Sequence, residues 1–140
     1  MVQGKKILLV DDDSDFRSST RKILESGGYE VVEAANGEEG YRKAKSENPD
    51  LAIIDIIMES FSEGFNLIKR LNEDEWTRGV PRIVLTSLGL QQEMDMISAE
   101  ELGTKYIVQK PVKRDEFLEV VQAAIRTTPV AKKNELGDVG

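Results

Sequence analysis

Residues 7–13 read Ile-Leu-Leu-Val-Asp-Asp-Asp, an apolar run that ends abruptly in three carboxylates. Two later runs end in a similar way: residues 51–54, Leu-Ala-Ile-Ile, lead into Asp55, and residues 106–109, Tyr-Ile-Val-Gln, lead into Lys110. Short apolar runs of this kind are typical of the buried strands of a parallel sheet. Because the carboxyl ends of parallel strands open on the same edge, we expect these carboxylates and the lysine to meet in one crevice.

Close carboxylates repel one another, and each raises the pKa of the next unless a cation lies among them. A hard cation that prefers oxygen ligands, Mg²⁺ or Mn²⁺, suits such a cluster. The alternative is that Asp11, Asp12 and Asp13 form a solvent-exposed turn that caps a helix and binds no ion. A calcium loop is excluded, because its sixth position is Phe16 instead of Gly and its twelfth is Lys22 instead of Glu. The sequence also contains no phosphate-binding loop of the G-x-x-x-x-G-K-[ST] type.

Short β-branched runs alternate with amphipathic stretches along the chain. We predict strands near 5–10, 29–34, 51–55, 81–86 and 105–109, and helices near 14–27, 37–47, 64–75, 90–102 and 113–127. Ser14 is the expected N-cap of the first helix. This alternation predicts an α/β fold with a parallel sheet and helices on both faces. Residues 128–140 lose the periodicity, so we expect one domain over 1–127, followed by a tail or the start of a linker.

Composition narrows the possible functions. The net charge of −7 argues against a standing nucleic-acid surface or an anionic membrane surface. With no apolar run of membrane-spanning length and no signal peptide, we expect a cytoplasmic protein without a membrane partner. The absence of both cysteine and histidine excludes Ser-His-Asp and Cys-His nucleophile systems, so any phosphohistidine chemistry must come from another molecule.

The order of these motifs, completed by Thr86 at the end of residues 82–85, resembles the receiver domain of two-component response regulators over residues 5–127. The resemblance implies a flavodoxin-like, doubly wound, five-stranded parallel sheet of order 2-1-3-4-5 with five helices. It also implies a signalling domain switched by phosphorylation. Such a domain assists its own phosphotransfer and dephosphorylation without being an enzyme in the ordinary sense.

By the same resemblance, Asp55 is the phosphoacceptor for a histidine kinase or a histidine phosphotransfer protein. Asp12 binds Mg²⁺ directly, Asp11 binds it through water, and the Ile57 carbonyl supplies a further ligand beside Asp55. Asp13 is then a spectator.

In the same scheme, Thr86 binds the phosphoryl group through its hydroxyl and Lys110 pairs with it. The output face is built from the fourth and fifth helices and the strand between them. That face engages a downstream effector domain or protein, or a second copy in a phosphorylation-dependent homodimer.

The sequence departs from the family pattern in three places. Glu59 replaces a common proline, and residues 60–64 form a longer loop, which we expect to be less rigid. Ile107 occupies the aromatic switch position, with Tyr106 displaced by one residue and hence to the opposite face.

The positions two residues after Asp55 and Thr86 are the apolar Ile57 and Leu88, which cannot orient a hydrolytic water. Two other functions stay open at this point. One is a phosphatase resembling the haloacid dehalogenases, with Asp11 as nucleophile and Asp13 as general acid. The other is a receiver fold that serves as an unphosphorylated interaction scaffold.

Overall fold

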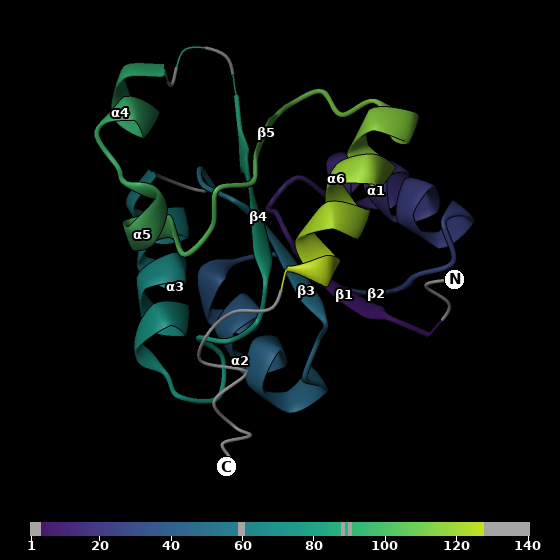
Figure 1. Ribbon diagram of the computed structural model, residues 1–140, viewed down its shortest axis with the longest axis horizontal. Helices are drawn as coiled ribbons and strands as arrows, with labels where there is room; N and C mark the ends of the chain where they lie inside the picture. Colours follow the sequence, from purple (N-terminus) through teal and green to yellow (C-terminus); the bar gives the residue numbers. More distant parts are fainter. Residues whose placement is uncertain (1–3, 59–60, 88, 90, 128–140) are drawn as a thin grey trace.

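The computed structural model describes residues 4–58, 61–87, 89 and 91–127. Its strands are β1 (Lys6–Val10), β2 (Glu30–Ala34), β3 (Leu51–Asp55), β4 (Arg82–Thr86) and β5 (Ile107–Gln109). They form one parallel sheet in the order β2-β1-β3-β4-β5 (Figure 1). The predicted strands, their direction and their order are therefore confirmed.

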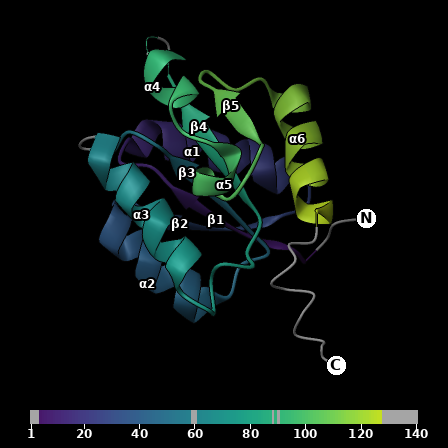
Figure 2. The same cartoon turned by 60° about the vertical axis from the view of Figure 1, so that its left-hand side comes forward.

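Helices cover both faces of the sheet. They are α1 (Ser14–Ser26), α2 (Gly37–Glu47), α3 (Phe61–Glu73), α4 (Gln91–Asp95), α5 (Ala99–Leu102) and α6 (Arg114–Arg126). Figure 2 shows α2 and α3 on one side of the sheet and α6 on the other. Alternate residues of β3 serve the two faces: Ile53 packs in the cluster with α1 and α6, whereas Ile54 packs in the cluster with α2 and α3.

The predicted fourth helix is wrong as a single element. Its described part is two short helices, α4 and α5, because Ser98 begins a new helix at this point. The Ser98 side chain accepts from the backbone N–H of Glu101, and the Glu101 carboxylate accepts from the backbone N–H of Ser98. This reciprocal capping box ends one helical segment and starts the next, so the described residues contain six helices instead of the five expected.

Two helix starts also differ from expectation. The N-cap of α1 is Asp13, one residue before the predicted Ser14, and its carboxylate accepts from the N–H groups of Asp15 and Phe16. α3 begins at Phe61, so most of the predicted loop over 60–64 is helical. Gly64 makes this possible, because its missing Cβ leaves room for the backbone carbonyl of Ile56.

The strand order places a reversal between β1 and β3, since the chain moves outward from β1 to β2 and then returns to the other side of β1. In open parallel sheets, ligands bind at the carboxyl edge beside such a reversal. Asp11 follows β1 and Asp55 ends β3, so both acids lie at this point. Across the described ranges, every helix is too short or too polar to span a bilayer.

Candidate functional site

The side chains predicted to meet at the carboxyl edge do so. Lys110 follows β5, and its Nζ lies 2.8 Å from Asp11 Oδ2 and 2.9 Å from Asp55 Oδ2. Asp11 is 0% exposed and Asp55 4% exposed, so both carboxylates are withdrawn from solvent. One ammonium group thus bridges the ends of β1 and β3.

Each of the two buried carboxylates is oriented by the backbone that follows it. The N–H of Asp13 donates to Asp11 Oδ1 at 2.9 Å, and the N–H of Ile57 donates to Asp55 Oδ1 at 3.0 Å. Both Oδ1 atoms are therefore fixed by an amide two residues further along the chain. Both Oδ2 atoms face Lys110.

The electrostatics of the site follow from burial. Burial raises the pKa of Asp55 to about 6, against the opposing effect of Lys110 and with added repulsion from Asp11. Burial alone would lower the pKa of Lys110, but its contacts with Asp11 and Asp55 outweigh that effect and raise it. The ammonium is thus firmly charged, and the Asp55 carboxylate is held ionised only against a substantial cost of burial.

A hard cation fits the acidic residues of this edge. Asp11, Asp12 and Asp55 each offer one carboxylate oxygen, and these oxygens lie within 4.8 Å of one another. Asp11 Oδ2 is buried, and the Lys110 ammonium lies 2.8 Å from it. Three carboxylates beside one ammonium leave an excess of negative charge, and their oxygens are a suitable ligand set for Mg²⁺.

Thr86 reaches the same edge from the neighbouring strand. It ends β4 and is 7% exposed. Its carbonyl accepts from the backbone N–H of Lys110 at 2.8 Å, which ties the end of β4 to the residue after β5. The structure therefore places all four motifs at one end of the sheet.

Two residues that border the site were missed by the sequence reasoning. The ring of Phe16 lies under Lys110, with Nζ 4.1 Å from the ring centroid. Arg17 donates to the Asp11 carbonyl at 2.6 Å and pairs with Glu33 at 2.9 Å. Their place in the first turn after the Asp11–Asp13 run was the available signal, because a helix that starts there turns its first residues toward the strand end.

Ile107 and Tyr106 lie on opposite faces of the sheet. Ile107 is paired with Val84 in register but is 45% exposed, so little packing depends on it. Tyr106 packs against the cluster on the opposite face, beside α6, and its hydroxyl lies 3.2 Å from Thr127 Oγ1. The predicted displacement of the aromatic ring to the other face is confirmed. Glu59 and Leu88 lie outside the described residues.

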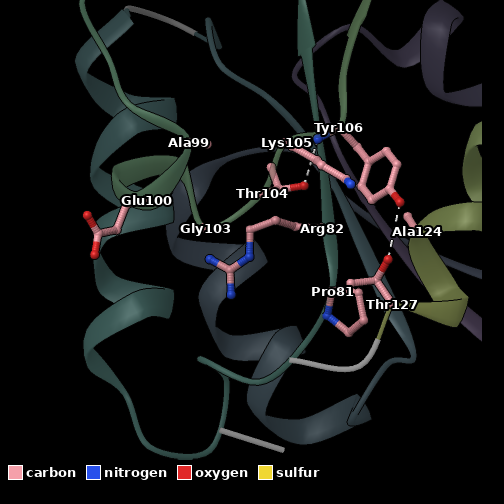
Figure 3. Close-up of a pocket in the computed structure, with 10 residues that line it drawn as sticks. All are labelled: Pro81, Arg82, Ala99, Glu100, Gly103, Thr104, Lys105, Tyr106, Ala124 and Thr127. Carbon is pink, nitrogen blue, oxygen red and sulfur yellow. Dashed lines mark hydrogen bonds between the residues drawn. The ribbon is translucent and has the colours of Figure 1, made fainter. Parts of the chain in front are cut away.

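A cavity of about 350 Å³ lies at the opposite edge of the sheet (Figure 3). Its walls come from the starts of β4 and α5, the segment that leads into β5 and the end of α6, and they include Arg82, Lys105 and Tyr106. None of the acidic site residues lines it. The carboxyl edge and this cavity are therefore separate features of the molecule.

Comparison with known proteins gives the same assignment as the geometry. A family model described as the response regulator receiver domain matches residues 7–122. The chain belongs to the response regulator receiver domain family. It is thus a phosphoacceptor signalling domain of the two-component type, and the phosphatase alternative is wrong. The phosphatase alternative required Asp13 as the general acid, whereas its carboxylate caps α1 by accepting from the N–H groups of Asp15 and Phe16.

Curated relatives include two from Pseudomonas aeruginosa. The chain is 34% identical to the phosphate regulon transcriptional regulatory protein PhoB, over 89% of this chain and 53% of PhoB. It is 31% identical to protein PilH, over 86% of this chain and 97% of PilH. The receiver domain described here thus spans about half the length of PhoB and nearly all of PilH.

Solved receiver structures agree with the fold. A CheY-like response regulator receiver domain protein from Methanospirillum hungatei is 29% identical with a TM-score of 0.74, covering 97% of this chain and 98% of that one. The receiver domain of the sensor histidine kinase PA1611 from Pseudomonas aeruginosa is 28% identical with a TM-score of 0.78, covering 89% and 99%. That second structure has a magnesium ion coordinated in its active site cleft.

Proposed function

We propose that Asp55 is the residue of this receiver domain that accepts the phosphoryl group. The observation that carries the proposal is the orientation of its carboxylate, in which Oδ1 accepts from the Ile57 N–H and Oδ2 lies 2.9 Å from Lys110 Nζ. A carboxylate held in this manner offers one oxygen as a nucleophile, beside a cation that neutralises charge on the incoming group.

The reaction is an in-line displacement at phosphorus. An Asp55 oxygen forms the new O–P bond while the P–N bond of a phosphohistidine on a partner protein breaks. The electron pair of the P–N bond stays on the imidazole nitrogen. The donor is a histidine kinase or a histidine phosphotransfer protein, and the phosphohistidine lies on that partner because this chain contains no histidine of its own. Lys110 stabilises the negative charge on the transferred oxygens.

Mg²⁺, or Mn²⁺ in its place, belongs to the same site. Asp12 would bind it directly, Asp11 through water, and Asp55 and the Ile57 carbonyl would complete the protein ligands. When bound, the ion neutralises phosphoryl oxygen charge during transfer. The proximity of three carboxylate oxygens, two of them from buried residues, supports this ligand set.

Thr86 and Lys110 would form the switch after phosphorylation, with the Thr86 hydroxyl and the Lys110 ammonium both bound to the phosphoryl group. The output face then comprises α4 and α5, which replace the predicted fourth helix, together with β5 and α6. It would meet an effector domain or protein, or a second copy of the chain. Exposure of Met96 at 83% and of Ile107 at 45% supports a contact surface there. We place the domain in the cytoplasm, together with its phosphohistidine donor.

Mapping the phosphate tests the assignment. The protein is incubated with acetyl phosphate and Mg²⁺, and the labelled residue is identified by mass spectrometry after borohydride reduction. We expect label on Asp55 and none in Asp55→Asn. Label on Asp11 would contradict the assignment, and the absence of any label would favour the interaction scaffold.

The metal ligands are tested separately by thermal unfolding against Mg²⁺ concentration. A cation that binds only the folded state raises its stability with concentration. Asp12→Asn should lose most of that gain, whereas Asp13→Asn should keep it, because asparagine preserves the cap of α1. Equal losses in both variants would refute the role of Asp12.

A further inference from the structure

We propose that Phe16 is a positioning residue, whose ring holds the Lys110 ammonium in place for phosphoryl transfer. The inference rests on the proposed function of Asp55 and Lys110. It adds a group that carries no charge, binds no metal ion and takes no part in the displacement itself.

The contact is a cation–π interaction. Lys110 Nζ lies over the Phe16 ring, 4.1 Å from its centroid, well within the range of about 6 Å over which such pairs attract. The Lys110 side chain is 20% exposed, so much of its surface is covered. Two carboxylates and one aromatic face thus account for the described contacts of the ammonium.

The ring is itself fixed by the start of α1. Asp13 Oδ1 accepts from the Phe16 N–H at 3.2 Å and from the Asp15 N–H at 3.0 Å. Phe16 also packs against the buried cluster that α1 and α6 share with the sheet. Asp13, expected from the sequence to be a spectator, therefore holds the helical turn that presents Phe16 to Lys110.

This arrangement matters because lysine has a long and flexible side chain. An ammonium with one side in water would sample several positions, and each departure would leave Asp55 Oδ2 without its partner. The ring replaces water on that side with a weakly polar face and attracts the charge at the same time. A preorganised cation needs no rearrangement when charge develops on the phosphoryl oxygens.

The test varies the ring's electrostatics while keeping its shape. Phenylalanine at position 16 is replaced by its mono-, di- and trifluorinated forms, which progressively weaken the negative face of the ring. The rate constant for phosphorylation by acetyl phosphate is then measured at saturating Mg²⁺. We expect a stepwise fall with each added fluorine. Phe16→Leu should be about fivefold slower than the unsubstituted protein, the effect of losing one cation–π contact worth about 1 kcal/mol.

Phe117 supplies the matched control. It is 2% exposed in the same buried cluster, so fluorination there tests packing alone. We expect its rate to stay unchanged along the series. A Phe16 series that is flat, or that matches the Phe117 series step for step, would overturn the proposal.

A second readout does not depend on phosphorylation or on the metal. A ring over Lys110 shifts the NMR signals of the Lys110 ε-methylene protons upfield, and Phe16→Leu should return them to ordinary positions, whereas Phe16→Tyr should not. Unshifted signals in the unsubstituted protein would disprove the contact. Failure to label Asp55 would instead count against the proposed function, and the NMR shift would still decide the contact.

Discussion

Lys110 Nζ lies 2.9 Å from Asp55 Oδ2, and this pair joins the end of β5 to the end of β3 across the intervening strand β4. The ammonium offsets only part of the cost of burying the Asp55 carboxylate, whose pKa is raised to about 6 chiefly by burial. The fold thus keeps an ionised carboxylate, destabilised by its burial, at the position where phosphoryl transfer requires a nucleophile. Sites of this kind commonly reduce stability in favour of function.

Asp55→Asn should therefore stabilise the metal-free protein. The folded state binds the Asp55 proton more tightly than the unfolded state, whose pKa is near 3.8, so the wild type loses stability as pH rises from about 4 to 6. The amide carries no such penalty. We expect a gain on the order of 2 kcal/mol at pH 7.5 that disappears near pH 4.

Thermal unfolding in a chelating buffer between pH 4 and 7.5 measures this effect. Asp95→Asn, a substitution at an exposed position of α4, is the control and should show no comparable gain. A pH-independent difference between Asp55→Asn and the wild type would contradict the assigned cause.

Gly64→Ala should destabilise the domain although alanine is the better helix former. A Cβ at this position would overlap the Ile56 carbonyl and would lie 2.7 Å from the Asp55 carbonyl oxygen. Neither backbone group can move without shifting the end of β3. We expect a loss of about 3 kcal/mol in chemical denaturation, the upper range for an overpacked core.

Lys69→Ala, at an exposed position of the same helix, should change stability by less than about 0.5 kcal/mol. If Gly64→Ala were instead as stable as Lys69→Ala, the close approach of α3 to β3 would be wrong.

Ile107→Ala should cost far less than a core substitution. A loss of about 2–5 kcal/mol is expected only for a buried isoleucine such as Ile83, which is 0% exposed, whereas Ile107 is 45% exposed. For Ile107→Ala we expect a loss of less than about 1 kcal/mol in the free energy of unfolding, measured by urea denaturation. Tyr106→Phe should be nearly silent, because the hydroxyl bond to Thr127 is solvent-exposed. Equal costs for Ile107→Ala and Ile83→Ala would disprove the assigned exposure.

The positions of the strands, and the convergence of the site residues at one edge of the sheet, could be predicted because both follow from local sequence patterns. The run that ends in Asp55 is buried on both faces, and an uninterrupted apolar run of this kind is typical of a central strand in a parallel sheet. Once the strands are parallel, their carboxyl ends must share one edge. Asp11, Asp55 and Lys110 could therefore be brought together without any knowledge of side-chain geometry.

Features set by tertiary contacts were harder to predict. The start of α3 at Phe61 depends on Gly64 fitting against the Ile56 carbonyl, which the local sequence does not reveal. The exposure of Ile107 depends on what covers β5, which is an edge strand of the sheet. The contact of Phe16 with Lys110 joins residues 94 positions apart in the chain, and no spacing rule connects them.

The phosphoryl group on Asp55 should be long-lived for its class. Hydrolysis requires a water in line with the O–P bond, and Ile57, two residues after Asp55, offers no polar group to hold it. Ile57 is half-buried and packs against the cluster under α2 and α3, so its side chain is directed by apolar contacts. Glu63, in the first turn of α3, offers a carboxylate that could hold such a water instead. Glu63 Oε2, however, accepts from the Gly37 N–H at 2.9 Å, which ties it to the start of α2.

We therefore expect Ile57→Asn to speed dephosphorylation by up to about tenfold, the effect of one hydrogen bond to a positioned water worth about 1.4 kcal/mol. Leu88→Glu, at the second flanking position, should act in the same direction. Decay of phospho-Asp55 is followed with excess Mg²⁺ after removal of the donor, and Ile57→Leu serves as the apolar control. A wild-type phosphate that decays as fast as in both polar variants would show that another group already positions the water.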